Sequence, residues 1–106
     1  MTQVPSVGRI VHYVLSEEDV NGINRRRADG ESHMSEHRER SDGSQVHIGN
    51  RAVAGAIYPL IITRVWGSDP TSGVNGQVLL DGNDAYWATS RVPGETPGTW
   101  HWPERV

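Results

Sequence analysis

A polar stretch of thirty residues, 16–45, places the strongest limit on how this chain can fold. It contains eight acidic side chains and five arginines, so it carries the whole formal net charge of −3. Its apolar side chains are only Val20, Ile23, Ala28 and Met34. So little apolar surface cannot offset the conformational entropy that is lost when thirty residues are ordered. The core must therefore come from the rest of the chain, and 16–45 is predicted to be an insertion.

The first half of this insertion has the signals of a short helix. Ser16, with Asp19 three positions later, resembles a capping box, and acidic residues fill the first turn. The pair Asp29-Gly30 predicts the end of the helix. The second half, 31–45, contains the turn-forming cluster Ser41-Asp42-Gly43-Ser44 and is predicted to be a mobile loop.

Short strands are predicted on both sides of the insertion. They are the segments 8–15, 60–66, 77–80, 86–90 and 99–103. Between the third and fourth of these, Asp81-Gly82-Asn83-Asp84 predicts a tight hairpin whose turn uses positive φ angles. The predicted core consists of Ile10, Val14, Leu60, Ile62, Val65, Val78, Leu80, Trp87 and Val92.

This order of elements predicts a mainly β protein built as a small SH3-like barrel of five strands. The polar insertion, with its helix, lies between strands one and two, and residues 1–106 form a single domain. A barrel removes most exposed strand edges and needs only a small core, which suits a chain of 106 residues. An open sheet with a packed helix is the alternative.

Composition excludes several classes of protein. The chain has no cysteine, which excludes disulfides and thiolate chemistry. A net charge of −3 is the opposite of what binding to bulk nucleic acid requires. The most apolar stretch, 52–66, is interrupted by Gly55, Pro59 and Arg64 and is too short to span a membrane, and the first fifteen residues lack a secretion signal. We therefore expect neither a membrane nor bulk nucleic acid as a partner.

Aromatic and guanidinium groups point to a binding function. In an extended segment Trp100 and Trp102 lie on one side and His101 on the other, so the two indoles either close the core or form a platform for a planar ring. Arginines would hold phosphates and the 47–51 loop would contact polar edges. The candidate ligand-binding residues are Trp100, Trp102, His101, His47, Asn50, Arg51, Arg9, Arg91, Arg105 and Trp66.

Three further groups of residues are of types that carry chemistry in other proteins. The run Arg25-Arg26-Arg27 either clamps a phosphate or compensates the dipole at a helix end, and the second reading is favoured. The segment 33–37 spells H-x-x-E-H, but it lies in the least apolar part of the chain, so we expect no metal site. Ser90, His12 and Asp81 lack any supporting motif. We therefore predict no catalytic residues and no cofactor.

Two terminal motifs carry a resemblance to known proteins. The first motif, near the start of the chain, is Gly8-Arg9-Ile10-Val11-His12-Tyr13-Val14, and the second, near its end, is Pro97-Gly98-Thr99-Trp100-His101-Trp102-Pro103-Glu104-Arg105. With 62–67, 77–84 and 87–90 between them, these segments resemble a group of short bacteriophage and prophage proteins. The resemblance implies a phage origin and brings neither an activity nor catalytic residues with it.

Together these features predict a non-enzymatic phage protein in the bacterial host cytoplasm. The leading hypothesis is a homo-oligomer that binds and sequesters a small nucleotide-derived immune signal. The alternative is a structural part of the virion, such as a head decoration, connector or tail component, because exposed indoles also suit protein interfaces. An enzyme that degrades the signal is a third and weaker hypothesis, since no catalytic constellation is evident.

Overall fold

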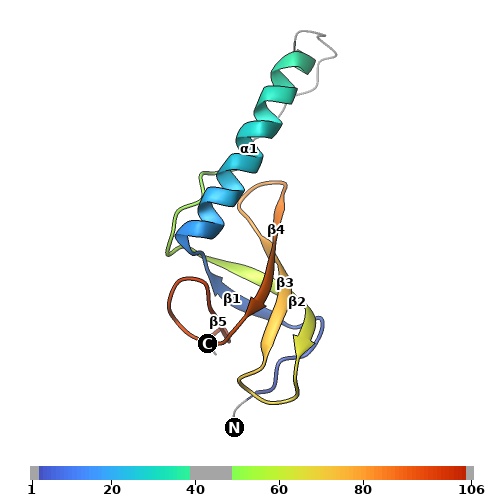
Figure 1. Cartoon of the computed structure of the whole chain (residues 1–106), viewed down its shortest axis with the longest axis vertical. Helices are drawn as coiled ribbons and strands as arrows, with labels where there is room; N and C mark the ends of the chain where they lie inside the picture. The colour runs from blue at the N-terminus through green and yellow to red at the C-terminus, as the bar shows by residue number, and fades with distance from the viewer. Residues whose placement is uncertain (1–2, 39–48, 105–106) are drawn as a thin grey trace.

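Five strands and one helix follow one another along the part of the chain that is described (Figure 1). The computed structural model describes residues 3–38 and 49–104, and for residues 30–38 it describes the backbone alone. The elements are β1 (Ile10–Val14), α1 (Glu17–Arg38), β2 (Ile57–Trp66), β3 (Gly73–Leu79), β4 (Ala85–Arg91) and β5 (Trp100–His101). The protein is mainly β, and its helix is inserted between the first two strands, as predicted.

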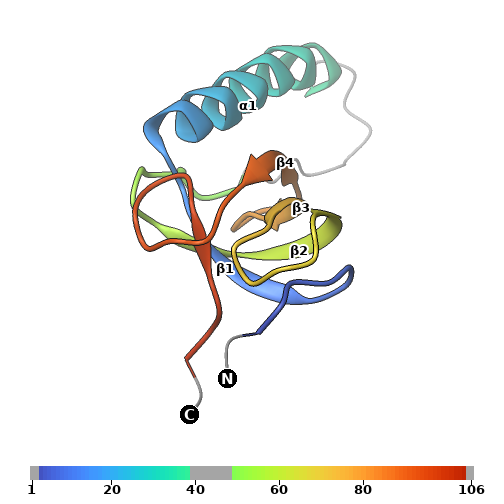
Figure 2. The same cartoon turned by 60° about the horizontal axis from the view of Figure 1, so that its bottom comes forward.

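The five strands form one antiparallel sheet in the order β4-β3-β2-β1-β5. The sheet is not closed, so the predicted barrel is not confirmed. It does curl, because an isolated parallel bridge joins Pro93, just beyond β4, to Trp100 of β5. The Trp100 N–H donates to the Val92 carbonyl at 3.2 Å, and the Gly94 N–H donates to the Trp100 carbonyl at 2.8 Å. The helix α1 lies over one end of this curled sheet (Figure 2).

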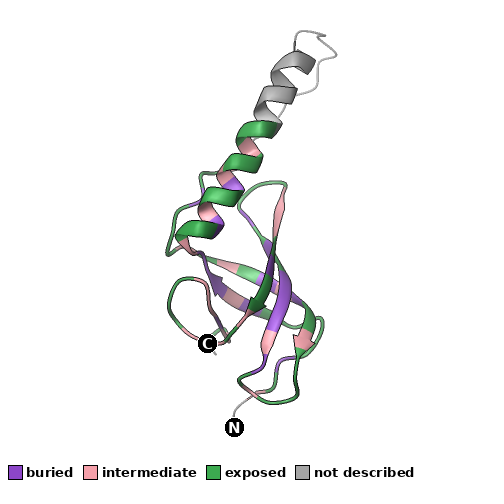
Figure 3. Cartoon of the chain, in the orientation of Figure 1, coloured by how far each residue is buried: buried purple, intermediate pink, exposed green. Residues whose placement is uncertain are grey.

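The core faces the opposite side of β1 from the one predicted. Val11, Tyr13 and Leu15 are fully buried, whereas Ile10 is 52 % exposed, so its prediction as a core residue is wrong. Apolar residues occupy both sides of this strand, so alternation alone does not choose between them. Val14 is buried as predicted. Burial is concentrated in the strands and in the first turns of α1 (Figure 3).

The other core predictions are mostly confirmed. Leu60, Ile62, Val78 and Leu80 are buried, and Val65 is partly buried against them. Trp87 and Val92 are wrong, since both are more than half exposed. Trp87 lies next to the buried Ala88 and so points to the outer side of β4. Residues that the prediction omitted take their places, namely Ile23 of α1, Val74, Ala88 and Trp100.

A β-bulge near the end of β4 changes which side chains face the core. Between Ala88 and Arg91, β4 has one residue more than the facing stretch of β3. Ser90 adopts a left-handed conformation there, with φ of 54°, and its N–H donates to the Asn75 side-chain oxygen at 2.7 Å. The extra residue shifts the alternation of the strand. Arg91 therefore lies on the same side as the buried Ala88.

The helix begins as predicted and ends later than predicted. The Ser16 hydroxyl accepts from the Asp19 N–H at 3.1 Å, and the Asp19 carboxylate accepts from the Ser16 N–H at 3.0 Å, which confirms the capping box. The helix continues through Asp29-Gly30 to Arg38, so the predicted stop is wrong and 31–38 is helical rather than a loop. A glycine in a helix costs only about 1 kcal/mol relative to alanine and does not oblige it to end. Residues 39–45 lie outside the described residues.

The predicted hairpin between β3 and β4 is present, but its turn has a different geometry. Leu79 pairs with Ala85, so five residues connect the strands. Gly82, which is among the described residues, does not have the positive φ that the prediction gave this turn. The turn is held instead by hydrogen bonds from the Leu80 N–H to the Asp84 carbonyl (3.3 Å) and from the Gly82 N–H to the Leu80 carbonyl (2.9 Å).

Candidate ligand-binding cleft beside the helix

A buried carboxylate fixes the first turn of α1 to the sheet. Asp19 is fully buried, and its carboxylate accepts from the Tyr13 hydroxyl at 2.5 Å and from the Arg91 guanidinium at 2.9 Å. Arg91 can reach it because of the bulge at Ser90. One side chain thus serves as a helix cap and as an ion-pair partner.

The pKa values of this cluster follow from burial and hydrogen bonding. Burial alone would raise the pKa of Asp19, but hydrogen bonds from Tyr13 and Ser16, together with the charge of Arg91, lower it below its ordinary value. Burial raises the pKa of Tyr13 far above that of a free tyrosine, and the hydrogen bond to Asp19 adds to this rise. Asp19 is therefore held as a carboxylate and Tyr13 as a neutral phenol.

A second carboxylate fixes α1 two turns further on. The Arg27 guanidinium donates to both oxygens of Asp84, each at 2.9 Å, and to the Asn50 carbonyl at 2.6 Å. Arg26 adds a contact to Asp84 at 3.2 Å. The hydrogen bond from Arg27 is the main cause that lowers the pKa of Asp84. Two of the three consecutive arginines thus bind the β3–β4 hairpin, and none of the three stands at a helix end.

The loop that enters β2 is held against the helix by the same network. The Asn50 side chain donates to the Asp81 carboxylate at 2.6 Å, and the Asn50 N–H donates to the Asp81 carbonyl at 2.8 Å. Asn50 was predicted to contact a ligand, but its side chain is used to hold this loop. These contacts hold the loop beside α1.

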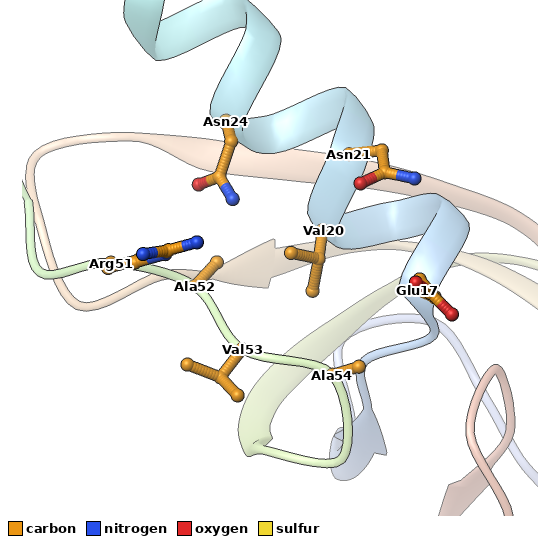
Figure 4. Close-up of a pocket in the computed structure, with 8 residues that line it drawn as sticks. All are labelled: Glu17, Val20, Asn21, Asn24, Arg51, Ala52, Val53 and Ala54. Atoms are coloured by element: carbon orange, nitrogen blue, oxygen red, sulfur yellow. The ribbon is translucent and has the colours of Figure 1, made fainter.

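A cleft of about 530 Å³ lies between this loop and the first turns of α1 (Figure 4). Its lining residues are Glu17, Val20, Asn21 and Asn24 from α1, and Arg51, Ala52, Val53 and Ala54 from the loop. Arg51 and Asn24 lie at one end, Glu17 and Ala54 lie at the other, and Val20 is between them. The volume falls within the range of sites that bind small molecules.

The two ends of the cleft differ in charge. Among the described residues, no hydrogen bond or ion pair engages the side chain of Arg51 or of Glu17. A free guanidinium is a bidentate donor for phosphate or carboxylate, and the amide of Asn24 adds a donor and an acceptor beside it. The valines and alanines offer an apolar middle. The cleft can thus receive a ligand with an anionic end, a flat or apolar body and a donor group facing Glu17.

The indoles predicted to stack on a ligand are placed differently from one another. Trp100 is fully buried and donates its ring N–H to the Arg91 carbonyl at 3.0 Å, so it closes the core and presents no platform. Trp102 is partly buried, edge-on to Trp100 with ring centroids 5.7 Å apart, and the Arg9 guanidinium lies 4.7 Å from its centroid. His101 lies edge-on to His12, 5.8 Å between centroids.

Among the residues that the structure describes, the remaining predicted site residues do not line the cleft. Arg91 is engaged by Asp19. Trp66 is half exposed, donates to the Asn75 side chain at 3.0 Å, and has the Arg64 guanidinium 3.9 Å from its ring centroid. His47 and Arg105 lie outside the described residues. Of the ten candidate ligand-binding residues, Arg51 alone is seen to line the cleft.

The sequence reasoning missed the residues that α1 contributes to the cleft. Glu17, Asn21 and Asn24 are spaced by four and then three positions, which places them on one face of a helix. The spacing is readable in the sequence once the capping box has fixed the helix start. What the sequence does not show is that the loop 51–54 folds back against that face.

Neither comparison with known proteins nor the other features of the described residues assign a function to the chain. No family model, no curated protein and no solved structure matches the chain. Among the described residues, no three side chains of the metal-ligating types come together. His33 and His37 of the H-x-x-E-H motif lie on α1 where only the backbone is described. No helix in the described part of the chain is long and apolar enough to cross a bilayer.

Proposed function

We propose that this chain is a non-enzymatic phage protein that binds a small nucleotide-derived signal and withholds it from the bacterial host. The observation that carries the proposal is the cleft beside α1, where Arg51, whose side chain has no partner among the described residues, stands next to Asn24. An anionic group of the ligand would bind these two side chains, and the ring would lie on Val20 and Val53. Glu17 would accept a hydrogen bond from an amino or hydroxyl group at the far end.

Sequestration fits this cleft better than turnover does. The ionisable side chains that line it are Glu17 and Arg51, at opposite ends. A nucleophile with a base in hydrogen-bond reach, the minimum for acyl or phosphoryl chemistry, is not among the lining residues. Binding without chemistry removes the signal from its receptor by mass action, and this requires only high affinity and sufficient copies of the protein.

The proposal extends to the fold and to the place of action. We propose that the curled sheet is a small SH3-like barrel, a reading supported by the bridge between Pro93 and Trp100. The resemblance of both terminal motifs to phage proteins supports a phage origin and action in the host cytoplasm, where nucleotide signals are made.

The test is a binding measurement on the purified protein with cyclic dinucleotides and cyclic ADP-ribose isomers, using thermal shift followed by calorimetry. At least one of these ligands should raise the melting temperature at saturation. Arg51→Gln should weaken its binding about 10-fold or more, since a hydrogen bond to a charged group contributes about 1.5–3 kcal/mol. Arg25→Gln changes an exposed arginine of α1 that does not line the cleft, and it is the matched control. The proposal fails if no ligand stabilises the protein or if Arg51→Gln binds as tightly as the wild type.

A virion component is the second candidate, favoured by a different observation. Several large apolar side chains on the outer side of the sheet are exposed. Trp87 is 59 % exposed, more than Trp66, which is 50 % exposed. Exposed indoles are common anchors of protein interfaces. Mass spectrometry of purified virions separates the two candidates, because a structural component would be present in many copies and a signal-binding protein would be absent.

A further inference from the structure

The polar side chains that line the cleft have no protein partners, unlike those of the network beside them. Among the described residues, no hydrogen bond or ion pair engages the side chains of Glu17, Asn21, Asn24 and Arg51. By contrast, Arg27, one turn further along α1 than Asn24, donates to three acceptor atoms of the neighbouring loop and hairpin. Polar groups that converge on a concave site without protein partners are available to a ligand.

These four side chains form two pairs toward the two ends of the cleft. Asn24 and Arg51 lie at one end, and Glu17 and Asn21 lie toward the other (Figure 4). Glu17 and Asn21 are four positions apart in α1, so their Cβ atoms are about 5–6 Å apart on one face of the helix. Because Asn24 and Arg51 bind the anionic group in the proposed function, Glu17 and Asn21 are left to recognise the base.

The chemistry of the Glu17–Asn21 pair matches one base in particular. A carboxylate has two acceptor oxygens, and an amide supplies N–H donors. Guanine presents two neighbouring donors, N1–H and N2–H, beside the O6 acceptor on its pairing edge. Adenine presents one donor beside an unprotonated ring nitrogen, which repels a carboxylate oxygen. A carboxylate therefore makes two hydrogen bonds with guanine and only one with adenine.

The backbone that carries this pair is held by buried contacts. Asp19, which lies between Glu17 and Asn21 in the chain, is fully buried and is contacted by Tyr13 and Arg91. These contacts fix the first turn of α1 to the sheet. A binding group on a rigid element loses less entropy when a ligand arrives, and it holds its geometry well enough to discriminate between similar ligands.

We propose that the Glu17 end of the cleft selects guanine, so that the signal bound by this chain carries a guanine base. This inference rests on the proposed function, because it takes the phosphate to lie at Arg51. Glu17 accepts from N1 and N2 of the base, Asn21 donates to O6, and the ring lies against Val20. A base that lacks one of these N–H groups leaves an acceptor of the site unpaired, which weakens its binding.

The first test compares the cyclic dinucleotides of guanosine, inosine and adenosine by calorimetry. They share one backbone, and inosine differs from guanosine only in lacking the N2 amino group. The guanosine ligand should bind at least about 10-fold more tightly than the adenosine ligand, with the inosine ligand between them. Equal affinities, tighter binding of the adenosine ligand, or binding of cyclic ADP-ribose isomers alone overturns the guanine inference and leaves the proposed function standing. Absence of binding by all of these ligands overturns both.

The second test separates the two ends of the cleft. Glu17→Gln should reduce the preference for guanosine over adenosine to less than about 3-fold, because the amide keeps only one acceptor oxygen. Arg51→Gln should weaken the three ligands by the same factor, because their phosphates are identical. Glu18→Gln removes the other exposed glutamate of the same helical turn, which does not line the cleft, and should leave every affinity unchanged. A preference that survives Glu17→Gln, or that Glu18→Gln also removes, contradicts the role given to Glu17.

Discussion

Two aspartate–arginine contacts fix α1 to the sheet, and they differ mainly in their access to water. Asp19 is fully buried and is contacted by a tyrosine, an arginine and its own helix cap. The side chain of Asp84 is 23 % exposed and is held by the bidentate Arg27. A charged side chain near water can replace a lost protein partner with water molecules, whereas a buried charge depends on the partners that the fold supplies. We therefore expect the first contact to be required for the fold and the second to set how firmly the helix is held.

The largest effect is expected from Asp19→Asn. The amide cannot neutralise Arg91, whose side chain is only 27 % exposed and whose Nε is buried without a hydrogen-bond partner among the described residues. Removing one member of such a buried pair costs about 3 kcal/mol or more. Urea unfolding followed by tryptophan fluorescence would measure the loss. A cost below about 1 kcal/mol would mean that the buried Asp19 contact contributes no more to stability than the partly solvated Asp84 contact.

An intermediate effect is expected from Tyr13→Phe, which removes one hydrogen bond to Asp19 and keeps the buried ring. A hydrogen bond to a charged group contributes about 1.5–3 kcal/mol, so the free energy of unfolding should fall by about 2 kcal/mol. Tyr58→Phe is the control, because the Tyr58 side chain is also partly buried against the core and, among the described residues, makes no hydrogen bond to Asp19. If the free energy of unfolding falls equally in both variants, the Tyr13–Asp19 hydrogen bond makes no special contribution to stability.

The acid dependence of stability should sharpen the same contrast. The pKa of Asp19 is lowered in the folded protein, so its carboxylate stabilises the fold above its unfolded pKa, and this stability is lost as the pH falls through the folded value. Between about pH 5 and pH 2, Asp19→Asn should therefore show a flatter loss of stability than the wild type. The pKa of Asp84 is lowered as well, so Asp84→Asn should flatten the curve in the same direction. Urea midpoints over this range measure the slopes, and an unchanged slope in Asp19→Asn would show that other groups set the acid response.

The smallest effect is expected from Asp84→Asn at neutral pH. The pair with Arg27 is bidentate but partly solvated, and such pairs contribute about 1 kcal/mol or less. Because Arg27 also holds the Asn50 carbonyl, the loop beside the cleft should loosen more than the core does. Hydrogen exchange would then rise at residues 50–54 and stay unchanged in β2. Hydrogen exchange that stays at the wild-type rate in both regions would show that the loop does not depend on this pair.

For each of these contacts, sequence patterns predict the place of one partner and not that of the other. The capping box of Ser16 and Asp19 is local, so its residues lie three positions apart and could be recognised. The partner of Asp19 depends on a bulge 71 residues away from Asp19, at Ser90, and local patterns do not predict bulges. In the same way, Arg27 could be assigned to the helix, but its pairing with Asp84 depends on where the hairpin lies.

The errors in the predicted core have one physical origin. Segments 10–15 and 85–88 have apolar residues on both sides, so alternation defines two faces without saying which is buried. The packing of α1 and Trp100 against one side decides this, and exposed apolar residues such as Ile10 and Trp87 stay on the opposite side. In the cleft, Arg51 could be predicted from its type and loop position. The three residues from α1 could not, because their role depends on a loop returning to the helix.

The bulge at Ser90 implies that the attachment of α1 depends on the backbone of β4 as well as on its side chains. Ala88 and Arg91 are three positions apart, so regular alternation would place them on opposite sides of the strand, and the extra residue of the bulge is what turns Arg91 toward Asp19. A β-branched residue at position 90, which disfavours the positive φ found there, could therefore detach the helix without altering either residue of the contact. A β4 shortened by this one residue would keep the arginine inward without a bulge, so evolution can preserve the contact by either spacing.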